Sequence, residues 1–470
     1  MARLTFGDLM ATTTTTTTSH APPRTPPGPP PREGVLDSLV YFYRFLTDSI
    51  GTVGSRFERY GDIYYAPSGG VGLYVLRHPD HLYEVLVKDA AKYSKSHSSL
   101  SMLTKVLGHG LLTTDGDTWR RQRRMIQPAF GPKRLAGYAE MMVDETVHID
   151  GRWRDGATLD VSREMMELTL RVVCRTLFGH DIRGQTDAVA GAMEAFHGLL
   201  LTPSVVPDWV PIPTRKRADE ALAELDRLIF DIIDARRSGT DAPDPPDLLQ
   251  MLLEARDDAE DGDGGGLDDR EIRDQLVTLF LAGHETTSHG LTWAWYLLSQ
   301  NPEAEAKLHA ELDAVLGGRP PTYADLENLP YTRQVFEEAM RLYPPAYTMT
   351  RLAEEDTIIG GYPVPAGSEV VLWIYWAHHD PRWWPDPEAF RPERFTPEEA
   401  AKRPKLAYMP FGAGARACIG KVFAIIEATL ILAELAQRYR FELVPGHPVL
   451  PRPRITLAPK HGMQMTLRAR

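Results

Sequence analysis

The feature that most constrains this fold is a long helical stretch over residues 268–300. Asp268 and Glu271 give it a start that resembles a capping box, and Asn301-Pro302 ends it because proline cannot continue a helix. At 1.5 Å per residue, roughly 32 residues span about 48 Å, which is the width of a whole domain. We therefore expect this helix to cross the core and the other elements to pack around it.

Most of the remaining globular sequence has helical periodicity, with a smaller share of strand signals. Residues 63–76 alternate around Ser68-Gly69-Gly70, which is typical of a β-hairpin, and residues 358–371 and 449–467 carry further strand and turn signals. Residues 241–266 are rich in Asp, Gly and Pro and are predicted to form an exposed loop. The predicted fold class is mainly α with a small β portion.

The first 33 residues contain a threonine run and a proline-rich stretch, so we predict a disordered tail over 1–33 and one domain over 34–470. No signal peptide and no apolar run of about 20 residues is present. We expect a cytoplasmic monomer without a membrane anchor. The net charge of -12 argues against a nucleic-acid partner.

The chain has two cysteines, Cys174 and Cys418, which excludes a disulfide framework. Cys174 lies in an apolar helix and is interpreted as a core residue. Cys418 lies among three closely spaced glycines, Gly412, Gly414 and Gly420, and precedes a helix with an apolar face. These glycines permit tight turns and the close approach of a flat ligand. The start of a helix stabilises a thiolate, which can act as a nucleophile or as an iron ligand.

Two other interpretations of these motifs do not fit the sequence. Gly412-x-Gly414-x-x-Ala417 matches the loose dinucleotide fingerprint, but the preceding sequence lacks the βα alternation which that fold requires. His284-Glu285 and His289 resemble a zinc-protease motif with one residue too many. Five positions apart, the two histidines lie about 140° apart around the helix and cannot share one metal.

The segment from Phe411 to Gly420 reads Phe-x-x-Gly-x-Arg-x-Cys-x-Gly, and in this it resembles the haem-binding signature of the cytochrome P450 family. The resemblance implies the cytochrome P450 fold with haem b, held by Cys418 as the thiolate and metal ligand. It also implies that Arg416 pairs with a haem propionate, that Phe411 packs beside the thiolate and that Gly412 belongs to the haem cradle. Trp119, Arg123 and Arg351 are implied as further propionate donors.

A polar interruption in the long helix, residues 282–289, resembles the acid–alcohol motif of the same family. By this match Glu285 and Thr286 are catalytic, because reductive cleavage of dioxygen needs protons that a carboxylate relays and an alcohol holds. Gly283 is expected to leave room for the dioxygen. Glu338-x-x-Arg341 and Arg394 match a further family motif and are interpreted as structural. His378-His379-Asp380 is likewise interpreted as structural.

The resemblance implies a monooxygenase that hydroxylates or epoxidises a hydrophobic small molecule such as a fatty acid, terpenoid or steroid. Residues 199–213 are predicted to form a mobile lid. Electrons are expected from NAD(P)H through a separate ferredoxin and its reductase, docking on Arg120, Arg121, Arg124 and Lys421. The implied pocket residues are Leu103, Phe280, Ala282, Gly283, Tyr347, Met349 and Ile455, with Thr456 beside the last.

Two alternatives remain at this stage. A haem protein that binds or senses a small ligand without turnover would not need Glu285 and Thr286. A degenerate nucleotide-binding protein would purify without a Soret band. Together the motifs occur in the family's order over residues 35–470, and their conjunction favours the monooxygenase.

Overall fold

The computed structural model describes residues 25–31, 34–68, 71–96, 98–179, 213–239, 247–257 and 265–470. Most of the predicted tail and nearly all of the predicted lid, residues 199–213, lie outside these ranges. Residues 25–31 contact the domain, where Tyr65 donates a backbone hydrogen bond of 3.0 Å to Pro27.

Helices dominate the described chain, which confirms the predicted fold class. They are α1 (Val35–Thr47), α2 (Ser49–Tyr60), α3 (Pro79–Tyr83), α4 (Ser98–Leu107), α5 (Gly116–Ile126), α6 (Pro132–Asp150), α7 (Val161–Phe178), α9 (Pro213–Arg237), α10 (Leu248–Glu254), α11 (Asp269–Gln300), α12 (Pro302–Val315), α13 (Pro330–Leu342), α14 (Ile374–His378), α15 (Pro397–Ala400) and α16 (Lys421–Arg438).

The strands are short and form four small sheets. They are β1 (Ile63–Ser68), β2 (Val71–Leu76), β3 (Tyr93–Ser94), β4 (Thr158–Asp160), β5 (Met349–Ala353), β6 (Thr357–Ile359), β7 (Tyr362–Val364), β8 (Glu369–Leu372), β9 (Tyr439–Leu443), β10 (Pro451–Pro453), β11 (Leu457–Pro459) and β12 (Gln464–Ala469). The largest sheet has the order β1-β2-β8-β5-β3, and β10 pairs with β11 as a separate hairpin. The predicted hairpin is confirmed, since Ser68 pairs with Val71 across the β1–β2 turn.

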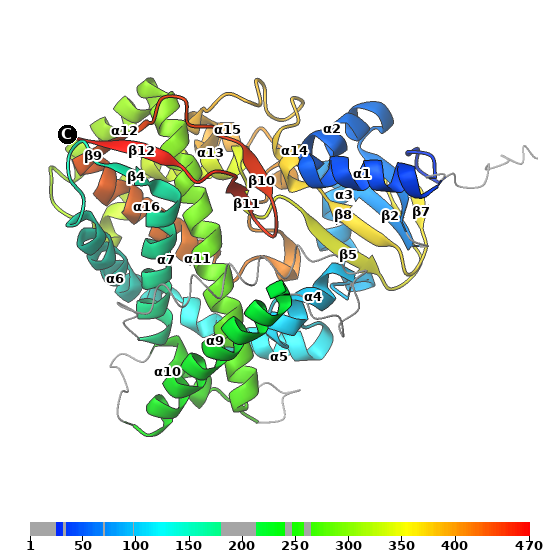
Figure 1. The fold of residues 1–470 in the computed structure, drawn as a ribbon, viewed down its shortest axis with the longest axis horizontal. Helices are drawn as coiled ribbons and strands as arrows, with labels where there is room; N and C mark the ends of the chain where they lie inside the picture. Colours follow the sequence, from blue (N-terminus) through cyan, green and yellow to red (C-terminus); the bar gives the residue numbers. More distant parts are fainter. Residues whose placement is uncertain are drawn as a thin grey trace, which may run out of the picture.

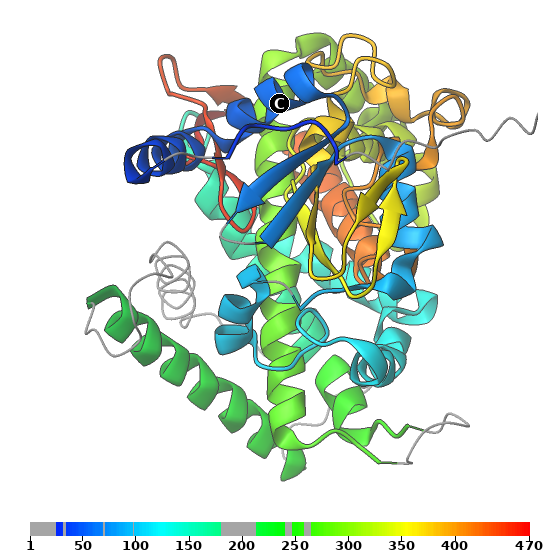
Figure 2. The same ribbon diagram turned by 90° about the vertical axis from the view of Figure 1, so that its right-hand side faces the viewer.

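The long helix predicted from the sequence is α11, with 32 residues and a complete capping box between Asp268 and Glu271. It runs the length of the molecule in both views, with α6, α7 and α16 on one side and the β1-β2-β8-β5 sheet on the other (Figures 1 and 2). The main hydrophobic core surrounds it, and two smaller cores lie on the two faces of the sheet. Two elements tied to sequence motifs pack directly on α11: α13, which carries Glu338 and Arg341, and α16, which follows the cysteine loop.

One loop prediction was wrong. Part of the stretch 241–266 forms α10, whose Leu248, Leu249 and Leu252 are buried. Asp247 caps this helix by accepting a hydrogen bond from Gln250 N, and it also forms a buried ion pair with Arg236 of α9. The Asp, Gly and Pro content of the stretch concealed a short apolar helix that tertiary packing stabilises.

No helix in the described part of the chain is long and apolar enough to cross a membrane.

Candidate active site

The loop that carries Cys418 is fixed by its own backbone and by two glycines. Cys418 N donates to Phe411 O at 2.8 Å, which closes the loop just before α16 begins at Lys421. Gly412 and Gly414 have φ of 69° and 68°, a conformation that favours glycine. A Cβ on Gly414 would lie 2.1 Å from Leu86 O, so no side chain fits there. The loop can therefore approach the neighbouring backbone closely, as the sequence predicted.

Cys418 is exposed although it lies at the head of a buried helix, whereas Cys174 is buried in α7. The protein atoms around its sulfur nevertheless raise the pKa of the Cys418 thiol through desolvation, whereas the Gly420 N–H, Arg123 and Lys421 act in the opposite direction. A metal cation bound to the sulfur would favour the thiolate, because coordination deprotonates a thiol.

Two of the predicted propionate donors, Arg416 and Arg123, lie against the ring of a third, Trp119. The Arg416 guanidinium lies 3.9 Å from the centroid of Trp119, and that of Arg123 lies 5.7 Å away. Arg416 donates to Thr114 O at 2.9 Å and forms an ion pair with Asp115, while Arg123 donates to Ala417 O at 3.0 Å. The structure therefore brings α5 against the cysteine loop.

Lys95 joins this group and was missed by sequence reasoning. Burial, then the positive charges of Arg351 and Arg416, lower the pKa of Lys95 to about 7, and Asp115 acts against them. Burial also lowers the pKa of Arg416 to about 10. A lone lysine after β3 carries no sequence pattern, so this cation was detectable only once the chain was folded.

This cationic group fits a haem, because it is built for anions. Asp115 is close enough to act electrostatically on Lys95, Arg351 and Arg416, and Arg123 is close enough to act on Lys95 and Arg416. The surplus of positive charge suits the two carboxylates of a porphyrin. The accessible sulfur and the glycine cradle lie next to it, so the donor set matches the prosthetic group that the sequence motif implies.

Helix α11 presents one accessible face in an otherwise buried segment. Ala282 is exposed and Thr286 half-buried, whereas their neighbours Leu281, His284 and Glu285 are buried. Thr286 Oγ1 donates to Ala282 O at 2.9 Å, which keeps both residues on the same face. This pairing places an alcohol on accessible surface in the middle of the molecule, as the acid–alcohol interpretation requires.

Gly283 has a packing role that the sequence did not reveal. A Cβ on this residue would lie 2.9 Å from Val173 Cγ2 on α7, so glycine lets α7 and α11 pack closely. The room for dioxygen beside Gly283 stays a prediction. Sequence reasoning could not distinguish the two roles, because both call for a missing side chain.

Glu285 is buried with 5% of its surface exposed, and Thr456 Oγ1 donates to its Oε1 at 2.5 Å. Thr456 belongs to the turn between β10 and β11, 171 positions along the chain. The sequence placed Thr456 only along the pocket, and nothing in it indicated a bond to the acid.

The remaining predicted pocket residues occupy several environments. Phe280 is buried against Phe178 of α7, with ring centroids 6.3 Å apart. Met349 of β5 reaches the cysteine loop, since its Cε lies 3.1 Å from the position of a Cβ on Gly412. Leu103 of α4 packs on the main core, Tyr347 donates to Arg454 O at 2.8 Å, and Ile455 is 37% exposed.

The residues interpreted as structural form a buried network. Arg341 makes a two-pronged ion pair with Glu338 at 2.7 and 2.8 Å, and Arg394 approaches Glu338 at 3.3 Å. Arg341 also donates to His378 O at 3.0 Å, and His378 Nε2 accepts from Met409 N at 3.0 Å. This chain of bonds connects α13 to the segment that leads into the cysteine loop. No group of three or more potential metal ligands occurs among the described residues.

The proposed basic docking face is largely neutralised. Arg121 is ion-paired with Glu271 at 2.8 Å, and Arg124 with Asp257 at 3.1 Å. Arg120 pairs with Asp117, and Lys421 is exposed 5.9 Å from the Phe411 ring. Arg121 and Arg124 thus hold the segments that precede α11, which weakens their assignment to a partner.

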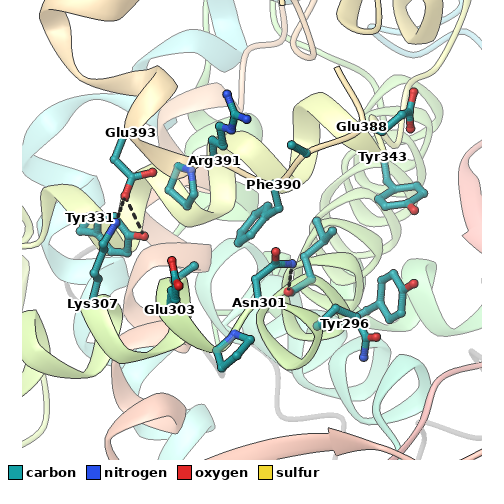
Figure 3. A pocket seen from close by; sticks show the side chains of 16 residues that line it. Tyr296, Asn301, Glu303, Lys307, Tyr331, Tyr343, Glu388, Phe390, Arg391 and Glu393 are labelled. Atoms are coloured by element: carbon teal, nitrogen blue, oxygen red, sulfur yellow. Dashed lines mark hydrogen bonds and ion pairs between the residues drawn. The ribbon is translucent and has the colours of Figure 1, made fainter. Parts of the chain in front are cut away.

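A separate groove of about 640 Å³ lies between the end of α11, the start of α12 and residues 388–393 (Figure 3). Lys307 and Glu393 form an ion pair of 2.5 Å at one side of it. None of the cysteine-loop or α5 residues lines this groove, so it is distinct from the candidate active site.

Comparison with known proteins gives one consistent result. A family model described as Cytochrome P450 matches residues 26–466. Cyclooctatin synthase of Streptomyces melanosporofaciens is 42% identical over 403 residues, which cover 85% of this chain and 87% of that protein. Cyclooctat-9-en-7-ol 5-monooxygenase of the same organism is 38% identical, over 82% of this chain and 84% of that protein. Pentalenene oxygenase of Streptomyces avermitilis is 34% identical, over 88% of this chain and 92% of that protein.

Proposed function

The chain belongs to the cytochrome P450 family, and from that premise we propose that this monooxygenase inserts oxygen into a terpenoid. The relatives named after cyclooctat-9-en-7-ol and pentalenene support this substrate class over fatty acids and steroids. The overall reaction consumes the substrate, O2, two electrons and two protons, and yields an oxygenated product and water. Hydroxylation and epoxidation both satisfy this balance.

Family membership implies a haem, which supplies the redox chemistry that activates dioxygen when it is bound. Cys418 would bind the haem iron through its sulfur, with Phe411 and Gly412 beside it. The haem carboxylates would pair with Arg123, Arg351, Arg416 and Lys95, and the Trp119 ring would support the Arg416 guanidinium. The surplus of positive charge around Asp115 supports this assignment.

The single observation that carries the proposal is the accessible Ala282–Thr286 face of α11 with the buried Glu285 beside it. Ala282 keeps this face small, so that a cosubstrate and an apolar substrate fit next to it. The Thr286 hydroxyl accepts and donates hydrogen bonds where dioxygen is reduced, and Glu285 supplies protons. A protein that only binds or senses a ligand has no use for this pair.

The substrate side is proposed to include Leu103, Phe280, Met349 and Ile455, which are apolar as small-molecule pockets are. A ferredoxin and its reductase, fed by NAD(P)H, are proposed as the electron source for a cytoplasmic monomer. With Arg121 and Arg124 ion-paired, Lys421 beside the cysteine loop is the cation that we retain for docking.

The first test is an optical titration of the haem-loaded protein with cyclic terpenes, fatty acids and steroids. We expect a Soret shift to high spin with a terpene, followed by an oxygenated product when a ferredoxin system supplies electrons. A shift with a fatty acid or steroid alone would overturn the substrate class, and a protein without a Soret band would overturn the haem assignment.

The second test replaces the alcohol. We expect Thr286→Ala to consume reductant but release mainly hydrogen peroxide. The rate of product formation should fall about 100-fold, which is the size of a lost general acid–base contribution. Thr292→Ala is a matched control, because Thr292 also donates to the carbonyl four residues earlier in α11, at 2.7 Å, but is fully buried. If both variants keep the wild-type ratio of product to reductant, the role of Thr286 is wrong.

A further inference from the structure

The hydrogen bond between Thr456 and Glu285 joins the β10–β11 turn to the acid of α11. Its length of 2.5 Å is typical of a hydroxyl that donates to a carboxylate. Both residues are buried, with 6% and 5% of their surfaces exposed. A buried carboxylate needs such a donor, because burial without one is costly.

The turn that carries Thr456 is fixed to its surroundings on both flanks. Trp293 Nε1, on the same helix as Glu285, donates to Leu457 O at 3.0 Å. Leu457 N donates to Pro345 O at 3.0 Å, and Arg454 N closes the turn by donating to Thr456 O at 3.1 Å. The hydroxyl of Thr456 therefore has a defined position relative to α11.

The bond holds one oxygen of the carboxyl group, Oε1, at a defined place. Ala282 and Thr286 share the accessible face of α11, whereas Glu285 lies about 100° around the helix from Thr286. The orientation of the Glu285 carboxyl group relative to the Thr286 face is therefore set in part by Thr456.

We propose that Thr456 is a positioning residue for the reaction: its hydroxyl holds the Glu285 carboxyl group in the orientation from which it takes up protons from water and passes them on beside Thr286. This inference deepens the proposed function and rests on it. The residue touches neither the reacting atoms nor the prosthetic group in this assignment and acts through Glu285.

The test compares Thr456→Val, which keeps the shape and removes the hydroxyl, with Thr456→Ser, which keeps the hydroxyl. In the haem-loaded enzyme we expect Thr456→Val to lower product per reductant about tenfold, the size of one hydrogen bond to a charged group. Its solvent deuterium isotope effect should rise, because proton delivery through Glu285 becomes slower. Thr456→Ser should restore the wild-type ratio and isotope effect.

A readout independent of turnover is a double-mutant cycle on the melting temperature, with Thr456→Val, Glu285→Gln and the pair. If the bond exists, the two losses are less than additive. The proposal would be overturned if the two losses in melting temperature were additive and Thr456→Val kept the wild-type ratio of product to reductant and the wild-type isotope effect. If Thr286→Ala also keeps the wild-type ratio of product to reductant, the acid–alcohol function itself is wrong. The double-mutant cycle separates this outcome from a failure of the positioning role, because it measures only the hydrogen bond between Thr456 and Glu285.

Discussion

Glu427 is a carboxylic acid in the middle of α16, with 0% of its surface exposed. Neither oxygen has a hydrogen-bond partner of good geometry among the described residues, although the Thr287 hydroxyl of α11 lies close enough to stabilise the charge weakly. Burial therefore raises the pKa of Glu427 well above its ordinary value. The neutral form of the side chain is therefore favoured where it packs between α16 and α11.

This raised pKa predicts a pH-dependent stability. The folded chain keeps a proton on Glu427 that the unfolded chain loses above about pH 4.3, so this contribution to stability is complete below that pH and falls as pH rises. Glu427→Gln keeps the shape of the neutral side chain but has no proton that titrates. We therefore expect its free energy of unfolding, relative to wild type, to increase by up to about 1.4 kcal/mol for each unit by which the pH rises, until the pKa of Glu427 in the folded chain is reached.

The measurement is the melting temperature of both haem-loaded proteins between pH 5 and 8. Glu442→Gln is the control, because Glu442 is half-exposed and ion-paired with Arg468 on the surface. Parallel profiles for wild type and Glu427→Gln would contradict a protonated Glu427, whereas profiles that diverge with rising pH support it.

At the scale of elements, the cysteine loop depends on the close approach of two backbones. Gly414 has no space for a side chain, because a Cβ there would meet the backbone oxygen of Leu86 in the one-turn helix Glu84–Lys88. Backbone atoms cannot rotate away as the end of a side chain can. The two elements must therefore separate if this glycine is replaced.

We predict that Gly414→Ala loses haem and stability far beyond the ordinary cost of a positive φ. Gly446→Ala is the matched control, since Gly446 has φ of 80° and nothing within 4 Å of its would-be Cβ. It should cost about 1–2 kcal/mol, the backbone strain alone. Haem content and melting temperature check both variants, and equal losses in the two would show that the Leu86 contact is unimportant.

At the scale of the whole molecule, one buried charge network connects the helical part to the cysteine loop. Glu338 and Arg341 are both fully buried, and Arg341 also donates to Pro387 O at 2.8 Å and His378 O at 3.0 Å. Arg391 N donates to Glu338 at 3.0 Å from the far side. Removal of one partner leaves an uncompensated charge in the core of the molecule.

We predict that Arg341→Met destabilises the fold by about 3–5 kcal/mol, because the Glu338 carboxylate stays buried without its partner. Arg333→Met is the control on the same helix. Arg333 is 56% exposed in its side chain and pairs with Glu337 at 3.3 Å, so its loss should cost less than about 1 kcal/mol. Urea unfolding and haem content distinguish these outcomes, and similar losses for the two variants would refute a special role of the buried network.

The sequence by itself determined what depends on near neighbours in the chain. The capping box and the proline after Asn301 bounded α11, the Gly-Gly turn predicted the β1–β2 hairpin, and the spacing around Cys418 identified the family. These signals are local because helix ends, turns and loop glycines are fixed by interactions within a few residues. The acidic, glycine-rich flanks of α10 misled the same reasoning, since its leucines are stabilised by distant helices.

Only the tertiary structure decided which distant residues meet. It placed Val173 opposite Gly283, brought Lys95 to Arg351 and Arg416, and set Thr456 against Glu285 across 171 positions of sequence. It also paired Arg121 and Arg124 with acids that the sequence left unassigned. Such contacts follow from how helices and hairpins pack around α11. Periodicity and spacing describe only near neighbours in the chain, so they do not indicate which distant residue becomes the partner.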